Sequence, residues 1–158
     1  MQVIGFNFTK ISAEHFPKFE GKSQINTNIE FLDLEEEKLS LLKDSEAVKI
    51  IFQYSITHSQ VKDKDKKEDK KKDQPENMNK KGEIIIEGNI VLSATKEEMK
   101  DVQKSWKKKE LPSAFKVPLF NIILRKCSSK ALDLEDQINL PLHLPFPQLK
   151  AGQQSESN

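Results

Sequence analysis

The chain has 158 residues, a formal net charge of +1 and a single cysteine. This length fits one domain, and one cysteine excludes an intrachain disulfide framework. The near-neutral charge gives no general attraction to nucleic acid or to a membrane surface. We expect no membrane insertion, because no apolar run approaches about 18 residues. We also expect a cytoplasmic location, because no secretory signal is visible before the first strand.

Four segments alternate between apolar and polar residues, which is the pattern of half-buried strands in an antiparallel sheet. They are residues 2–12, 24–34, 46–60 and 82–94. The third segment is the clearest, because five of its apolar side chains fall on one side of an extended chain: Val48, Ile50, Phe52, Tyr54 and Ile56. The order of the elements is therefore four strands followed by helices.

Residues 62–81 differ in composition from the rest of the chain. They contain nine lysines and six acidic residues, with no aromatic or β-branched residue. Such a segment buries too little apolar surface to offset the entropy lost on ordering, so we expect a disordered loop within a hairpin. An arm for acidic partners is the less favoured alternative. Residues 151–158 are expected to form a disordered tail, which leaves residues 1–150 as one domain.

Two helices are expected after the strands. Thr95 and Glu98 predict the start of the first, because this pair forms a capping box, and the helix should end near Lys108, before Pro112. The second helix, residues 117–138, is about 33 Å long at 1.5 Å per residue and organises the fold. Its apolar residues, spaced by three and four, form one stripe: Val117, Phe120, Leu124, Cys127, Ala131, Leu134 and Ile138.

Leu119, Ile122 and Ile123 of this helix lie off the stripe. Two apolar faces predict that the helix covers the sheet with one and meets another subunit with the other. These three residues are therefore the candidate oligomer contacts, and we expect a homo-oligomer, either a dimer or a tetramer. The predicted fold class is α+β, a four-stranded antiparallel sheet with the long helix on one face.

Catalytic and metal-binding patterns are not evident in the sequence. The five glycines form no phosphate-binding loop, and the three histidines (His15, His58, His143) are far apart, with no second ligand at metal spacing. Cys127 lies on the apolar stripe, which favours a small buried hydrophobe over a nucleophile. We therefore expect a protein that is not an enzyme, with no catalytic residue, no metal and no cofactor.

Trp106 precedes three lysines, residues 107–109, which is the one hint of nucleic-acid binding. An aromatic ring with neighbouring lysines can stack a base and hold a phosphate. However, Trp106 continues the apolar face that Met99 and Val102 give to the first helix, which favours core packing. Nucleic acid is therefore not the expected partner, although an RNA-binding module remains an alternative function.

Apolar residues are left over on both sides of the long helix. Residues 140–149 contain three prolines, which exclude a helix or a central strand, so we expect an extended apolar segment, called the strap below. Two interpretations stay open: the strap packs on the chain's own core, or it forms a hydrophobic groove or oligomer contact. The surplus residues are Trp106, Leu111, Phe115, Leu140, Leu142, Leu144, Phe146 and Leu149.

Short motifs in the same order along the chain resemble the SecB-like chaperone family. They are Lys10-Ile11-Ser12, Ile90-Val91-Leu92-Ser93, Pro118-Leu119-Phe120 with Arg125 and Cys127, and Phe146-Pro147-Gln148-Leu149. That family has a four-stranded antiparallel sheet covered by a long helix. In this chain the motif containing Phe146 lies farther from Cys127 than it does in the bacterial chaperones. The resemblance therefore leads us to expect a member without the family's terminal lid helix. The chain is therefore closer to a divergent member, for example an archaeal one, than to the bacterial export factor.

The resemblance implies an ATP-independent chaperone, or holdase, that binds unfolded or extended polypeptides through apolar contacts. Protein export is one process in which such a holdase acts. The expected groove is lined by Trp106, Phe115, Leu142, Leu144, Phe146 and Leu149. The alternative from another class is an oligomeric adaptor, or an antitoxin-associated scaffold, that uses the same surface for one specific protein partner.

Overall fold

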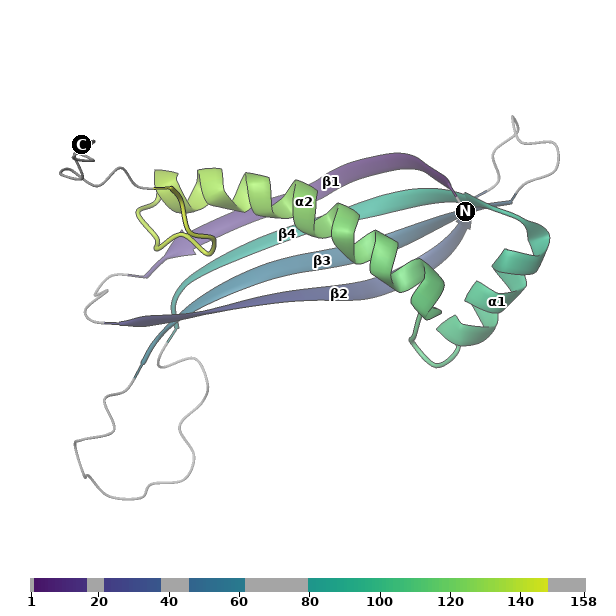
Figure 1. The fold of residues 1–158 in the computed structure, drawn as a ribbon, viewed down its shortest axis with the longest axis horizontal. Helices are drawn as coiled ribbons and strands as arrows, with labels where there is room; N and C mark the ends of the chain where they lie inside the picture. The colour runs from purple at the N-terminus through teal and green to yellow at the C-terminus, as the bar shows by residue number, and fades with distance from the viewer. Residues whose placement is uncertain (1, 17–21, 38–45, 62–79, 148–158) are drawn as a thin grey trace, which may run out of the picture.

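The computed structural model describes residues 2–16, 22–37, 46–61 and 80–147. In this part of the chain, four strands are followed by two helices (Figure 1). The elements are β1 (Gln2–His15), β2 (Ser23–Glu37), β3 (Glu46–Gln60), β4 (Lys80–Ala94), α1 (Lys96–Trp106) and α2 (Ser113–Gln137). The predicted fold class is confirmed, because the strands form one antiparallel sheet and α2 lies along one of its faces.

The sheet has the strand order β1-β4-β3-β2, and every neighbouring pair is antiparallel. Alternation in the sequence located all four strands, although β1 and β2 run farther than predicted. Lys80 and Lys81 belong to β4 rather than to the predicted loop, because Lys80 pairs with Ser59 and so continues the β3–β4 ladder. The rest of that loop and the predicted tail lie outside the described residues.

The core forms on the face of the sheet that α2 covers. Alternate residues of the two central strands have almost no exposed surface: Val48, Ile50, Phe52, Tyr54, Ile56, Ile84, Ile86, Ile90 and Leu92. Gly88 lies opposite Phe52 in this register. A Cβ atom at Gly88 would lie 2.8 Å from the Phe52 ring, so the glycine makes room for the largest apolar ring of the core.

The helix α2 crosses the sheet obliquely, from the β2 edge at its start toward β1 at its end (Figure 1). Near its start, Phe120 stacks on Phe31 of β2, with ring centroids 5.2 Å apart. Farther along, the ammonium group of Lys126 lies 5.2 Å from the ring of Phe6 in β1. A helix that crosses a twisted sheet presents a changing side to it, so the line of contact turns around the helix.

The buried side of α2 is a row of residues spaced by four: Phe115, Leu119, Ile123, Cys127, Ala131 and Glu135. The predicted stripe was wrong in the first half of the helix, where Val117 is 58% exposed and Leu124 is 40% exposed. It was right for Cys127 and Ala131, which are both fully buried. An alternating three-and-four spacing follows a straight contact line, whereas an oblique crossing follows the row of every fourth residue.

The helix α1 starts as predicted. The Thr95 hydroxyl accepts a hydrogen bond from the backbone N–H of Glu98 at 3.3 Å, and the Glu98 carboxylate accepts one from the backbone N–H of Thr95 at 2.9 Å. Met99 and Val102 are buried against the sheet. Neither helix in the described residues combines the length and apolar character needed to cross a membrane.

Candidate functional site

The strap turns back at the end of α2. Asn139 adopts a left-handed backbone conformation (φ 56°), and the backbone N–H of Leu140 donates to the carbonyl oxygen of Glu135 at 2.9 Å. The Leu140 side chain then packs where Gly82 of β4 has no side chain, since a Cβ there would lie only 2.5 Å from a Leu140 methyl group. Leu140 therefore anchors the strap, and only 5% of its surface is exposed.

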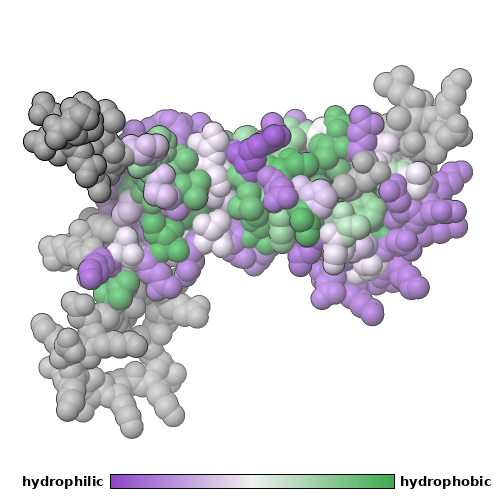
Figure 2. Space-filling view, in the orientation of Figure 1, coloured by the Kyte–Doolittle hydropathy of each residue, from purple (hydrophilic) through white to green (hydrophobic). Residues whose placement is uncertain are grey.

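A cavity of about 420 Å³ lies between the strap and the last turns of α2. Its lining residues are Ser129, Leu132, Asp133, Asp136, Leu142 and Phe146. Figure 2 shows hydrophobic surface gathered in the region where the strap meets α2. Phe146 is 60% exposed, the largest exposed fraction among the large apolar side chains described. The cavity is therefore lined by apolar side chains and by two exposed aspartates, and it is called the strap pocket below.

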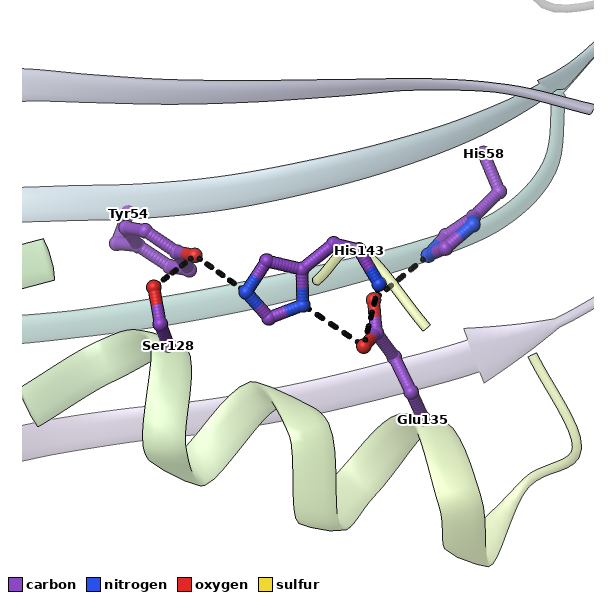
Figure 3. A network of polar contacts seen from close by, with 5 residues as sticks. All are labelled: Tyr54, His58, Ser128, Glu135 and His143. Atoms are coloured by element: carbon purple, nitrogen blue, oxygen red, sulfur yellow. Dashed lines mark hydrogen bonds and ion pairs between the residues drawn. The ribbon is translucent and has the colours of Figure 1, made fainter. Parts of the chain in front are cut away.

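A buried polar network lies beneath the strap (Figure 3). His143 points inward from the strap, and its ring Nδ1 lies 2.8 Å from Oε2 of Glu135. The same carboxylate oxygen accepts a hydrogen bond from the backbone N–H of His143 at 3.1 Å. On the other side of the ring, Nε2 lies 3.4 Å from the Tyr54 hydroxyl, which lies 3.0 Å from the Ser128 hydroxyl. One strap residue thus connects α2 with β3.

His58 of β3 completes the network. Its Nε2 lies 3.2 Å from Oε1 of Glu135, and neither side chain has any exposed surface. This is an ion-pair distance without hydrogen-bond geometry, so both ring nitrogens of His58 have no hydrogen-bond partner among the described residues. Burial lowers the pKa of His58 below its ordinary value of 6.5, against the opposing effect of Glu135. His58 is therefore neutral near pH 7, beside a buried carboxylate.

The network has acid–base groups but no route for a substrate to them. Tyr54, His58 and Glu135 are fully buried, and the His143 side chain is 4% exposed. No group of three or more histidine, cysteine, aspartate or glutamate side chains within the described ranges has an arrangement that could hold a metal ion. The geometry therefore fits a structural connection between the strap and the fold, and the strap pocket is the accessible part of the site.

Comparisons with known proteins add a structural likeness. No protein-family profile matches the chain, and no curated protein sequence matches it either. Among solved structures, the fold is similar to a SecB-like chaperone of Mycobacterium tuberculosis in complex with a ChAD peptide from the HigA1 antitoxin. The TM-score is 0.46 at 12% identity, over 96% of this chain and 92% of that chain. A likeness at this level assigns neither a family nor an activity.

The structure brings together only part of the predicted polypeptide-binding set. Leu142 and Phe146 both line the strap pocket, and Leu144 lies between them on the strap, 45% exposed. Trp106 and Phe115 lie at the opposite end of the molecule, where α1 ends and α2 begins (Figure 1). Leu149 lies outside the described residues. No single groove among the described residues is lined by all of these side chains, because the length of α2 separates the two groups.

Two further predicted residues belong to the fold rather than to an accessible surface. Phe115 is buried in the core, and Trp106 packs against the core while Lys109 lies 5.0 Å from its ring centroid. Cys127 is fully buried, as predicted, and burial raises its pKa to about 12. These positions favour the packing interpretation of Trp106 over a base-stacking one.

The candidate oligomer contacts do not share one outer face of α2. Leu119 and Ile123 have no exposed surface because they pack on the sheet, whereas Ile122 is half-buried. The prediction that Leu119 and Ile123 face another subunit was wrong, because the oblique crossing of α2 turns the row of every fourth residue toward the sheet. The large apolar residues that α2 exposes are instead Val117 and Leu124.

Sequence reasoning missed the His58–Glu135–His143 cluster. Two signals could have indicated it. His58 continues the series Tyr54, Ile56 at every second residue of β3, and Glu135 continues the row Cys127, Ala131 at every fourth residue of α2. Both positions are buried, and a polar residue in a buried position normally has a polar partner. His143 carries no such signal, because the strap has no regular period.

Proposed function

We propose that this protein binds extended or non-native polypeptide through apolar contacts at the strap pocket, as an ATP-independent chaperone or holdase. The observation that carries the proposal is the exposed Phe146 beside the cavity formed by Leu132 and Leu142. An exposed aromatic ring next to an apolar cavity leaves a surface that a partner's apolar side chain can cover. Such burial is non-directional, which suits clients of varied sequence.

The size of the strap pocket limits what one site can contribute. A cavity of about 420 Å³ has room for only a few side chains. Burying one large apolar side chain contributes about 1.5–3 kcal/mol, and association itself costs several kcal/mol, so a single pocket gives weak binding. An extended client gains further contacts if it pairs with the outer edge of β1, where Phe8 and Ile11 are 39% and 42% exposed.

Assembly into a dimer or tetramer is part of the proposal, because several weak sites on one particle bind a long client more tightly than one site does. The exposed Val117 and Leu124 on the outer face of α2 support such a contact. Light scattering at micromolar concentration measures the mass directly. A strict monomer would contradict this part of the proposal and leave the strap pocket to act alone.

The second candidate is an adaptor for one specific protein partner. The observation that favours it is that two aspartates line the strap pocket, Asp136 and Asp133, the latter paired with Lys130 at 3.1 Å, since charges at a contact discriminate between partners. Affinity purification from the native cell separates the two candidates. One dominant partner supports the adaptor, whereas a heterogeneous set of polypeptides supports the holdase.

The direct test is suppression of the aggregation of an unfolded model protein at pH 7.5. We expect suppression by the wild type, and loss of most of it in Phe146→Asp, which places a charge in the strap pocket. Leu32→Asp is the matched control, because Leu32 is 41% exposed on β2, which does not contribute to the pocket. The holdase proposal fails if the wild type gives no suppression at equimolar or higher ratios, or if both variants lose it equally.

A further inference from the structure

All three histidines of the chain meet at one place, where α2 ends and the strap begins. His15 of β1 lies with Nδ1 2.9 Å from the carbonyl oxygen of Ile138. His58 of β3 lies 3.2 Å from one oxygen of Glu135, and His143 of the strap lies 2.8 Å from the other. Three segments far apart in the sequence therefore each bring an imidazole to the last turn of α2.

The strap is held to the fold mainly at this junction. Leu140 packs on Gly82, and His143 makes two contacts to Glu135, one through its ring and one through its backbone N–H. Beyond these anchors the described part of the strap is open, because its other large apolar side chains there, Leu142, Leu144 and Phe146, are 37%, 45% and 60% exposed. Weakening the contacts near Glu135 would therefore free the strap without breaking the sheet.

His58 lies directly under the strap. Its neighbours in register are Ile25 of β2 and Gly82 of β4, which carry no charge, and Leu140 of the strap packs on that same glycine. The charged or titratable groups that face His58 are Glu135 from α2, His143 from the strap and His15 from β1. A protonated His58 in the closed structure would have one acidic partner, two other imidazoles nearby and no exposed surface.

We propose that this three-histidine junction is an acid-sensitive latch, in which protonation of His58 releases the strap from α2 and β4. The strap is the smallest of the elements that cover His58, so lifting it is the least costly way to bring water to a charged imidazole. Release also dismantles the strap pocket, because Leu142 and Phe146 move away from Leu132. That consequence for polypeptide binding rests on the proposed function; the latch itself does not.

The direction follows from the protonation of the two states. Burial lowers the pKa of His58 in the closed state below its ordinary value of 6.5, while in the open state the ring is solvated and its pKa returns toward 6.5. The free-energy preference for the closed state is therefore at its full value well above pH 6.5. It decreases as the pH falls through 6.5. For one imidazole that titrates near 6.5 in the open state, the opening equilibrium rises by at most about tenfold between pH 7.5 and pH 5.5.

Hydrogen exchange of backbone amides in the whole protein tests the latch without any client. The N–H groups of Leu140 and His143 report on the strap, because both donate to Glu135. The N–H groups of Phe52 and Ile86, in the central strands, report on the sheet. After correction for the intrinsic pH dependence of exchange, we expect strap protection to fall severalfold, by at most about tenfold, from pH 7.5 to 5.5, with sheet protection unchanged. Constant strap protection, or an equal loss in the sheet, overturns the latch.

A neutral replacement identifies the sensor. In His58→Gln the strap should keep the same protection at both pH values, whereas His15→Gln, which removes the other sheet imidazole, should keep most of the wild-type pH dependence. A His58→Gln variant with undiminished pH dependence refutes the assignment to His58. If that variant does not fold, titration of the three imidazoles in the wild type by NMR decides instead, since His58 protonation must parallel strap opening. Absence of aggregation suppression by the wild type at pH 7.5 would refute only the proposed function and would leave the latch intact.

Discussion

The orientation of α2 makes a sharp prediction about two leucines. Leu119 is fully buried, whereas Leu124 is 40% exposed. Truncation to alanine removes three carbon atoms, about 2.4 kcal/mol of transfer free energy when fully buried, and leaves a cavity at Leu119. We expect Leu119→Ala to cost about 3–5 kcal/mol of unfolding free energy. Leu124→Ala should cost about 1 kcal/mol, because the side chain is partly solvated and solvent fills the space.

Urea denaturation followed by circular dichroism measures both costs. Leucine and alanine have similar helix propensities, so that contribution nearly cancels between the two variants. With a slope of about 2 kcal/mol per molar urea, a difference of about 2–4 kcal/mol separates the midpoints by about 1–2 M. The contact row described for α2 is wrong if Leu124→Ala is the more destabilising variant at low protein concentration. A cost for Leu124→Ala that grows with concentration would instead place Leu124 in an oligomer contact.

Three further predictions follow from single contacts. Thr95→Ala removes the α1 cap and should cost about 1 kcal/mol of unfolding free energy, whereas Ser113→Ala, at an α2 start without a side-chain cap, should cost little in the same denaturation assay. Gly82→Val should displace Leu140 and speed strap hydrogen exchange at pH 7.5; Gly5→Ala, with ordinary 3.4 Å contacts, should not. Cys127, with its pKa raised to about 12, should react with a thiol-specific disulfide reagent at pH 8 only as fast as the protein unfolds; rapid labelling of the native protein would contradict its burial.

The sheet was predictable because a strand has a period of two and one buried face. In β3 and β4 every second residue is buried, so the pattern alone locates both strands and their inward side. The start of α1 was equally readable from Thr95 and Glu98, because a cap is local chemistry. The side of α2 that meets the sheet could not be predicted from the sequence, since the first half of the helix has apolar residues on several sides. The crossing angle decides which of them are buried, and that angle depends on sheet twist.

The candidate site divides in the same way. Composition indicated an apolar strap, and Leu142 and Phe146 do line a cavity, but the sequence could not say that Trp106 and Phe115 lie a helix length away from them. The histidine cluster was missed for a different reason. Its members come from β3, α2 and the strap. His58 and His143 reach the same carboxylate only because α2 lies on the sheet and the strap turns back at the end of α2.

Glu135 lies at a position where burying a charge is costly. It ends the buried row of α2, one turn after Ala131, and one of its oxygens has no hydrogen-bond partner within the described structure. A fully buried carboxylate costs several kcal/mol of desolvation, which well-packed apolar side chains of similar volume would avoid. The carboxylate instead fixes the position of His143 through the ring and the backbone N–H, and it thereby holds the irregular strap in one conformation. The strap pocket exists only in that conformation, because Leu142 and Phe146 of the strap line it. The costly burial of Glu135 therefore defines the accessible apolar surface, and through the proposed latch it makes that surface depend on the protonation of His58.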